Sequence, residues 1–192
     1  MSQTQIMKNA NAIRNREEPR DVYITPETLV RRHLSLFEGM SNVVVYDPFR
    51  GSGAYFNLFS EYFPNSTYLW SEIEAGRDFF DFTGDVDIIV SNPPYSIIEK
   101  VLDRCYDLRP RMISFLLCAH NATPRRIEMA NQRGYFVYDY TICRVDRFFG
   151  VSVLLTLSRD ICENVIGVDS TKHKLSVLPR PVEIPTHICN QL

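Results

Sequence analysis

The sequence lacks several features that would point to other classes of protein. It has no apolar run long enough to cross a bilayer, and its polar first twenty residues do not have the pattern of a secretory signal. Its five cysteines are odd in number and lack the spacing of a zinc site or disulfide framework. A net charge of −2 does not indicate a strongly basic nucleic-acid binder. We therefore expect an intracellular protein (cytoplasmic or nuclear) with no membrane contact, no secretion and no metal.

What the sequence does contain predicts one α/β domain. Its 192 residues, 45% hydrophobic, suffice for a substantial core. We expect residues 1–21 to be a flexible N-terminal arm, 22–160 the domain, and 161–192 an irregular tail packed on the surface. Strand patterns alternate with helical ones, and strands at 135–145 and 151–158 are expected to form an antiparallel hairpin. This order predicts a doubly wound, seven-stranded, mostly parallel sheet with a C-terminal β-hairpin.

The tetrapeptide Asn92-Pro93-Pro94-Tyr95 is the most informative motif, and it follows an apolar run at 87–91 that is typical of a buried strand. The Asn92 side-chain oxygen and the Pro93 carbonyl could accept the two hydrogens of an exocyclic amine and so localise its lone pair. Tyr95 could stack on a base swung out of its strand. The alternative is a turn that ends the strand, because Asn-Pro and Pro-Pro steps are common in turns.

A second motif, Asp-Pro-Phe-Arg-Gly-Ser-Gly at 47–53, follows the apolar run 43–46. Gly51 and Gly53 permit a tight turn and close approach of backbone to a ligand, although a Gly-x-Gly step alone also fits a turn without a ligand. The segment 54–59 is expected to open a helix whose N-terminus attracts an anion. The third glycine of the dinucleotide fingerprint is missing, which disfavours a nicotinamide cofactor. Both motifs end strands, so we expect them to face one crevice.

Together the two motifs resemble those of the amino-methyltransferases that use S-adenosylmethionine, especially the enzymes that methylate N6 of adenine in nucleic acids. The resemblance spans roughly 23–159 and has the motif order of the permutation with the cofactor half first. It implies S-adenosylmethionine as cofactor and nucleic acid, DNA slightly favoured over RNA, as substrate. The implied catalytic residues are Asn92, Pro93, Pro94 and Tyr95. The implied cofactor-binding residues are Thr25, Asp47, Phe49, Gly51, Gly53, Glu72, Asp78, Phe79 and Asn92.

The resemblance also implies individual roles. Asp47 would orient the amino group of the cofactor, and Glu72, after the strand at 67–71, would accept hydrogen bonds from its ribose. Asp78 would bond the cofactor adenine and Phe79 would lie beside it, with Glu74 and Asp81 as competitors or all of them as solvated charges. Thr25 is implied to help hold the carboxylate end of the cofactor. Thr25-Pro26 is equally explained as an ordinary helix start, with Thr25 as N-cap and Pro26 at the first helical position.

Two questions concern the substrate. Phe148 or Phe149 could face the target base opposite Tyr95, or could simply pack in the hairpin. The chain has no room for a separate target-recognition domain, so target recognition would come from loops, a homodimer or a partner subunit.

Two other functions stay open: methylation of a glutamine side-chain amide in a protein, whose nitrogen is also planar, and a catalytically idle binding subunit.

Overall fold

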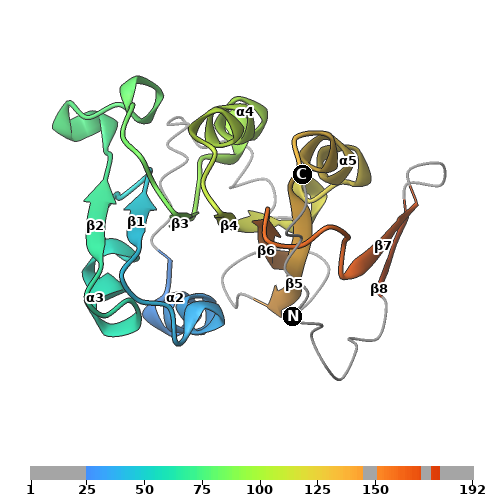
Figure 1. Ribbon diagram of the computed structural model, residues 1–192, viewed down its shortest axis with the longest axis horizontal. Helices are drawn as coiled ribbons and strands as arrows, with labels where there is room; N and C mark the ends of the chain where they lie inside the picture. The colour runs from blue at the N-terminus through green and yellow to red at the C-terminus, as the bar shows by residue number, and fades with distance from the viewer. Residues whose placement is uncertain (1–24, 145–150, 170–173, 178–192) are drawn as a thin grey trace, which may run out of the picture.

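The computed structural model describes residues 25–144, 151–169 and 174–177, and it is built around a six-stranded sheet in the order β2-β1-β3-β4-β6-β5 (Figure 1). The six strands are β1 (Val44–Asp47), β2 (Thr67–Trp70), β3 (Ile88–Ser91), β4 (Met112–Cys118), β5 (Phe136–Arg144) and β6 (Val151–Ser158). Neighbours from β2 to β4 pair in parallel, whereas β6 is antiparallel to both β4 and β5. Five of the six strands therefore point the same way, as a mostly parallel sheet requires.

Helices cover both faces of this sheet, as predicted for a doubly wound fold (Figure 1). The α-helices are α2 (Glu27–Leu34), α3 (Phe59–Tyr62), α4 (Ile98–Leu108) and α5 (Pro124–Gln132). In β3, Ile88 and Val90 pack with α2 and α3, while Ile89 between them packs with α4 and α5. Such alternation is expected where a strand is buried on both faces. None of the described helices has the length and apolar character needed to span a membrane.

The prediction of seven strands in the sheet is wrong for the described residues, which form six. Two further strands, β7 (Ile166–Asp169) and β8 (Lys174–Val177), pair only with each other as an antiparallel ladder. The expectation of an irregular segment after 160 is therefore also wrong in this part. Ile166 is 5% exposed and belongs to the main core, and the Val165 N–H donates to the Val137 carbonyl (2.9 Å). The predicted β5–β6 hairpin is confirmed.

The helix expected after the second motif is much shorter than predicted. Phe56–Leu58 forms a 3-10 turn, and α3 continues for only four residues before Pro64. This segment is rich in aromatic residues, which are poorer helix formers, and Phe59 and Phe63 are fully buried, so tertiary packing shapes it. A helix this short has few aligned peptide dipoles. The expected anion site at its N-terminus is therefore not supported.

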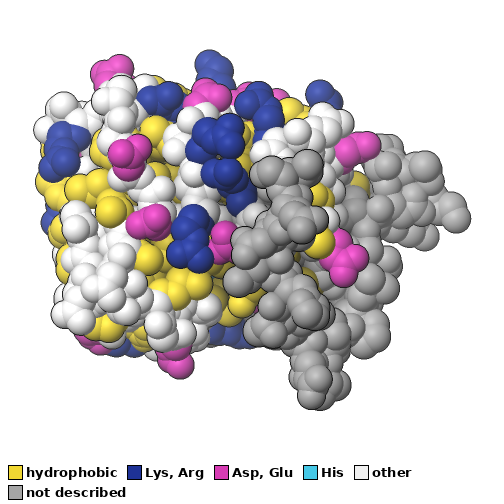
Figure 2. All heavy atoms as spheres, viewed as in Figure 1, with side chains coloured by type: hydrophobic (Ala, Val, Ile, Leu, Met, Phe, Trp, Pro, Cys, Tyr) yellow, Lys and Arg dark blue, Asp and Glu magenta, His cyan; other side chains and the backbone are white. Residues whose placement is uncertain are grey.

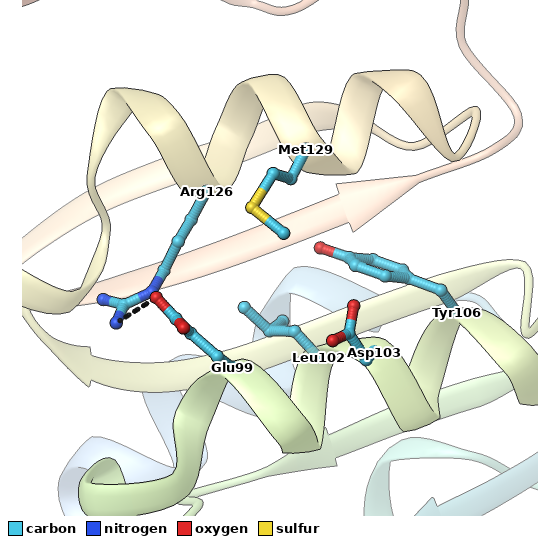
Figure 3. Close-up of a pocket in the computed structure, with 6 residues that line it drawn as sticks. All are labelled: Glu99, Leu102, Asp103, Tyr106, Arg126 and Met129. Atoms are coloured by element: carbon cyan, nitrogen blue, oxygen red, sulfur yellow. Dashed lines mark hydrogen bonds and ion pairs between the residues drawn. The ribbon is translucent and has the colours of Figure 1, made fainter.

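A small pocket lies between α4 and α5 (Figure 3). Its lining residues are Glu99, Leu102, Asp103, Tyr106, Arg126 and Met129. Figure 3 shows Arg126 reaching from α5 to Glu99 on α4, and their N···O distance is 3.4 Å. Arg133, the C-cap residue that follows α5, lies 3.7 Å from Asp107 and 3.9 Å from Asp103. These pairs join the two helices, and we interpret the pocket as a gap in their packing.

Candidate active site

The candidate site lies at the carboxyl edge of β2, β1 and β3, three neighbouring parallel strands. Asp47, the last residue of β1, stands opposite Trp70, the last residue of β2, and β3 ends at Ser91. The next residues of the chain, Glu72 after β2 and Asn92 after β3, therefore emerge at this same edge. The predicted juxtaposition of the two motifs is thus a direct result of the strand order.

Asp47 is the most unusual ionisable group of this edge, because its side chain is completely buried. Its Oδ1 accepts hydrogen bonds from the Ser91 hydroxyl (2.7 Å) and from the Phe49 N–H (3.3 Å). Its Oδ2 is buried and has no hydrogen-bond partner, although the Phe56 backbone lies near enough to favour the ionised form. Burial raises the pKa of Asp47 to about 7, against the smaller opposing effect of these hydrogen bonds. An unpartnered buried carboxylate oxygen is costly, so this atom is a candidate ligand contact.

The glycine loop, residues 47–55, is joined to the end of β2 by a hydrogen bond to Glu72. One carboxylate oxygen of Glu72 accepts the Gly51 N–H at 2.7 Å, and the other accepts the Glu74 N–H at 3.3 Å. Gly51 and Gly53 both have positive φ, 49° and 91°, which explains why glycine stands at these positions. A Cβ at Gly51 would meet no atom within 4 Å. The loop therefore presents backbone to open space beside a carboxylate.

Asn92 lies in the centre of a short hydrogen-bond chain. Its Nδ2 donates to the Thr25 hydroxyl at 3.1 Å, and its Oδ1 accepts the Tyr95 hydroxyl at 3.1 Å. The interpretation of Thr25 as a helix N-cap is wrong, because α2 begins at Glu27 with Pro26 as N-cap and no side-chain cap. Thr25, 5% exposed, instead contacts the amide of the first motif. The sequence offered no signal for this contact between residues 67 positions apart.

The Pro-Pro step after Asn92 supplies backbone carbonyls but no backbone N–H. Among the described residues no backbone N–H donates to the Pro93 carbonyl, whereas the Pro94 carbonyl accepts the Ile97 N–H at 3.4 Å. Pro93 is buried, and Pro94 is the N-cap of the 3-10 turn Tyr95–Ile97. This pattern fits the predicted need for a bare carbonyl next to the Asn92 amide.

Asp78 and Phe79 differ in their exposure, because Asp78 is half-buried and Phe79 is buried. Asp78 is half-buried and accepts the Phe80 N–H at 2.9 Å, so it caps the 3-10 turn Phe79–Asp81. Phe79 is only 2% exposed, with its ring 5.2 Å from that of Phe49. Phe79 thus packs in the core against Phe49, and its position beside the cofactor adenine stays a prediction. The neighbouring Phe80, 39% exposed, presents an accessible ring.

Two residues near this edge, Ser91 and Trp70, were not expected from the sequence. Ser91 holds the Asp47 carboxylate, and its position directly before the first motif is the one signal that could have indicated it. Trp70 stacks with two guanidinium groups, those of Arg50 and Arg77, at 4.8 and 4.0 Å from the ring centroid. These contacts link the loop to the end of β2, and no short-range pattern encodes them.

Phe148 and Phe149 lie outside the described residues, as does the predicted N-terminal arm, so their roles stay predictions. Within the described part of the chain, no group of three His, Cys, Asp or Glu residues could hold a metal ion.

Comparison with known proteins identifies the fold. No protein-family model and no curated protein matches the sequence. Solved structures match along most of the chain: a methyltransferase from Pyrococcus furiosus (19% identity, 83% of this chain and 98% of that chain, TM-score 0.55) and a Burkholderia thailandensis 1,6-didemethyltoxoflavin-N1-methyltransferase with bound S-adenosylhomocysteine (12%, 81% and 85%, 0.55). A chain of the E. cuniculi Mtq2 complex, responsible for methylation of the eRF1 translation termination factor, matches at 22% identity over 72% of this chain and 98% of that chain, with a TM-score of 0.51. The chain therefore has the Rossmann-like fold of class I methyltransferases.

Proposed function

We propose that this protein is an S-adenosylmethionine-dependent methyltransferase that acts on the exocyclic N6 amine of adenine in nucleic acid. The observation that carries the proposal is the convergence of Asp47, Glu72 and Asn92 at one sheet edge, beside a positive-φ glycine loop. The methyltransferase fold supports the reaction class, and the Asn-Pro-Pro-Tyr motif supports the acceptor.

The residues of this edge fit the proposed cofactor. The buried, unpartnered Oδ2 of Asp47 suits an ammonium group, which would supply the missing hydrogen bond and favour the ionised carboxylate. Glu72 suits a pair of ribose hydroxyls, although it must then share or release the Gly51 N–H. The open space beside Gly51 suits close approach of a ligand to backbone. Asp78 stays a candidate for the adenine of the cofactor.

The chemistry requires positioning more than acid–base catalysis. When bound, S-adenosylmethionine supplies a methyl group that is already activated on a sulfonium. Asn92 Oδ1 and the Pro93 carbonyl would accept the two amine hydrogens and localise the nitrogen lone pair, and Tyr95 would stack on the base. Alignment of this kind can contribute about 7–11 kcal/mol. In the structure Asn92 Oδ1 accepts the Tyr95 hydroxyl, so an incoming amine would replace this hydroxyl as donor.

Surface charge agrees with weak or assisted binding of nucleic acid. The face seen in Figure 2 carries Lys and Arg side chains gathered over the region of α4, with Asp and Glu side chains among them. The formal net charge of the whole chain is −2. Phosphate contacts dominate the affinity of most nucleic-acid binders, so this protein would depend on single-stranded or flexible substrate, or on a partner, more than on charge.

A second candidate function is methylation of a protein side-chain amide. It is favoured by the structural similarity to a chain of the Mtq2-Trm112 complex, which is responsible for methylation of eRF1. That chain is 22% identical to this one. An amide nitrogen is as planar and delocalised as the adenine amine, so the same two acceptors would serve it. The two functions differ in the product, which makes them separable by experiment.

The test is incubation with tritiated S-adenosylmethionine and separate pools of DNA, RNA and protein. The proposal predicts label that nuclease releases and that migrates as an N6-methylated adenine nucleoside. Label that resists nuclease and is released by protease would establish the second function instead. A protein that neither binds S-adenosylmethionine nor labels any pool would be the idle subunit considered from its sequence.

A further inference from the structure

The proposed reaction makes no use of His33, an imidazole of α2 that is completely buried. Its Nδ1 lies 2.9 Å from the Tyr55 hydroxyl, and its Nε2 lies 2.7 Å from the Ser114 hydroxyl. The Ser114 hydroxyl lies 2.7 Å from that of Thr156, its direct partner across β4 and β6. Four buried polar groups thus form one continuous chain from the glycine loop, through α2, to the middle of the sheet.

Every link of this chain can be a hydrogen bond, with the donors running in either direction along it. Burial lowers the pKa of His33 to about 3, so the imidazole is neutral and can donate through one nitrogen and accept through the other. Tyr55 is 3% exposed, and Ser114 and Thr156 are fully buried, so water cannot replace a lost partner. Buried polar networks with every member paired hold a single geometry, because any other arrangement leaves a group unpaired.

Tyr55 is the point at which this chain reaches the candidate site. It follows Gly53 by two residues, and burial, together with the nearby Asp47 and Tyr95, raises its pKa well above the usual value. The same helix α2 begins two residues after Thr25, whose hydroxyl accepts the Asn92 amide. α2 lies on the same face of the sheet as α3 (Figure 1). It is linked to both halves of the site, to the glycine loop through the His33–Tyr55 contact and to Asn92 through the preceding Thr25.

We propose that His33 is a positioning residue, which holds Tyr55 and thereby fixes the glycine loop, residues 47–55, in the conformation that binds the cofactor. The proposal rests on the proposed function for the identity of the ligand. It does not require His33 to touch cofactor or substrate. Its distinguishing consequence is that breaking the His33–Tyr55 hydrogen bond loosens the loop, whereas breaking the far end of the same chain does not.

The test compares Tyr55→Phe and His33→Phe with the control Thr156→Val, which removes a hydroxyl from the far end of the chain at nearly constant volume. We expect hydrogen exchange of the loop peptide in the ligand-free protein to rise in both test variants and stay at the wild-type level in Thr156→Val. The Kd for S-adenosylmethionine should rise about tenfold in the test variants, the effect of one lost buried hydrogen bond, and stay unchanged in the control. All three variants should melt at a lower temperature.

Two results would overturn the positioning role. The first is hydrogen exchange of the loop peptide that is no faster in Tyr55→Phe than in Thr156→Val, when both variants lose a comparable amount of melting temperature. The second is a Kd for S-adenosylmethionine in Tyr55→Phe that equals that of the wild type. Should His33→Phe fail to fold, Tyr55→Phe alone decides, because it keeps the ring and its packing. Failure of the wild-type protein to bind S-adenosylmethionine would refute the proposed function, and the exchange comparison would still show whether His33 holds the loop.

Discussion

At the scale of single residues, the buried carboxylate of Asp47 is unfavourable for folding and is proposed to bind the cofactor. Its carboxyl group is buried with one oxygen unpartnered, and its pKa of about 7 lies well above the ordinary 3.8. The folded protein without ligand therefore holds this proton more tightly than the unfolded chain does. A cationic ligand group reverses the preference, because it interacts with the ionised form. Ionisable groups with strongly shifted pKa values are common at functional sites.

The first prediction is that affinity for S-adenosylmethionine depends on the ionised fraction of Asp47. Below pH 7 the affinity should fall about tenfold per pH unit, since only the carboxylate form is competent to bind. Calorimetric titrations from pH 5.5 to 8.5 would measure this (the range is about 1.5 units on either side of the pKa). Asp47→Asn should bind weakly at every pH. An affinity that is flat between pH 5.5 and 8.5 would contradict this role of Asp47.

The same carboxyl group predicts a pH dependence of stability without ligand. Because the folded-state pKa is raised, the contribution of Asp47 to stability is greatest below about pH 4 and is lost as the pH rises through 7. The melting temperature of Asp47→Asn minus that of the wild type should therefore increase between pH 4 and pH 8. Differential scanning calorimetry of both proteins checks this, and a difference that shrinks with rising pH would refute it.

Asn92 is predicted to act on the acceptor and not on the donor. Asn92→Ala should lower turnover by at least about 100-fold, the usual effect of removing one preorganised polar group, and leave the Kd for S-adenosylmethionine near that of the wild type. The conservative Asn92→Asp keeps an acceptor oxygen, and the Thr25 hydroxyl can donate to it, so part of the turnover should remain. Single-turnover kinetics and calorimetry measure the two quantities. Loss of cofactor binding in Asn92→Ala would show that this division of roles is wrong.

At the scale of elements, the glycine loop shows which parts of a site the sequence can predict. Gly51 and Gly53 were predictable because only glycine adopts positive φ readily, and both do so here. The carboxyl-edge location followed from strand order. The role of Thr25 was not predictable, because a Thr-Pro step has a local explanation as a helix start, and only the tertiary fold brings its hydroxyl to Asn92. Likewise, no local pattern distinguishes the buried Phe79 from the exposed Phe80.

The loop itself gives a prediction with a matched control. Gly51→Ala places a methyl group where no atom lies within 4 Å, at a φ of 49°, and Gly134→Ala does the same at a φ of 79° beyond α5. Both substitutions should lower the free energy of unfolding by about 1 kcal/mol, the cost of left-handed backbone for alanine. Only Gly51→Ala should also weaken S-adenosylmethionine binding. Equal binding by the two variants would mean that the space beside Gly51 is not used by the ligand.

At the scale of the whole molecule, alternating strand and helix patterns predicted the layers and the hairpin, but not the number of strands. Six strand patterns lie between 43 and 158, although their alternation with helical patterns led us to expect a sheet of seven strands. The strands that could have supplied the seventh, β7 and β8, form their own two-stranded ladder instead. Pairing partners are chosen by contacts between distant segments, so local pattern cannot decide between a seventh strand and a separate ladder.

The most direct test of the whole account is a crystal structure with S-adenosylhomocysteine, the donor without its methyl group. The account predicts its amino group against Asp47 Oδ2, its ribose against Glu72, its sulfur facing Asn92, and backbone of the Gly51 loop in contact with it. A ligand bound elsewhere, for example between α4 and α5, or an Asn92 side chain turned away from the sulfur, would contradict the account.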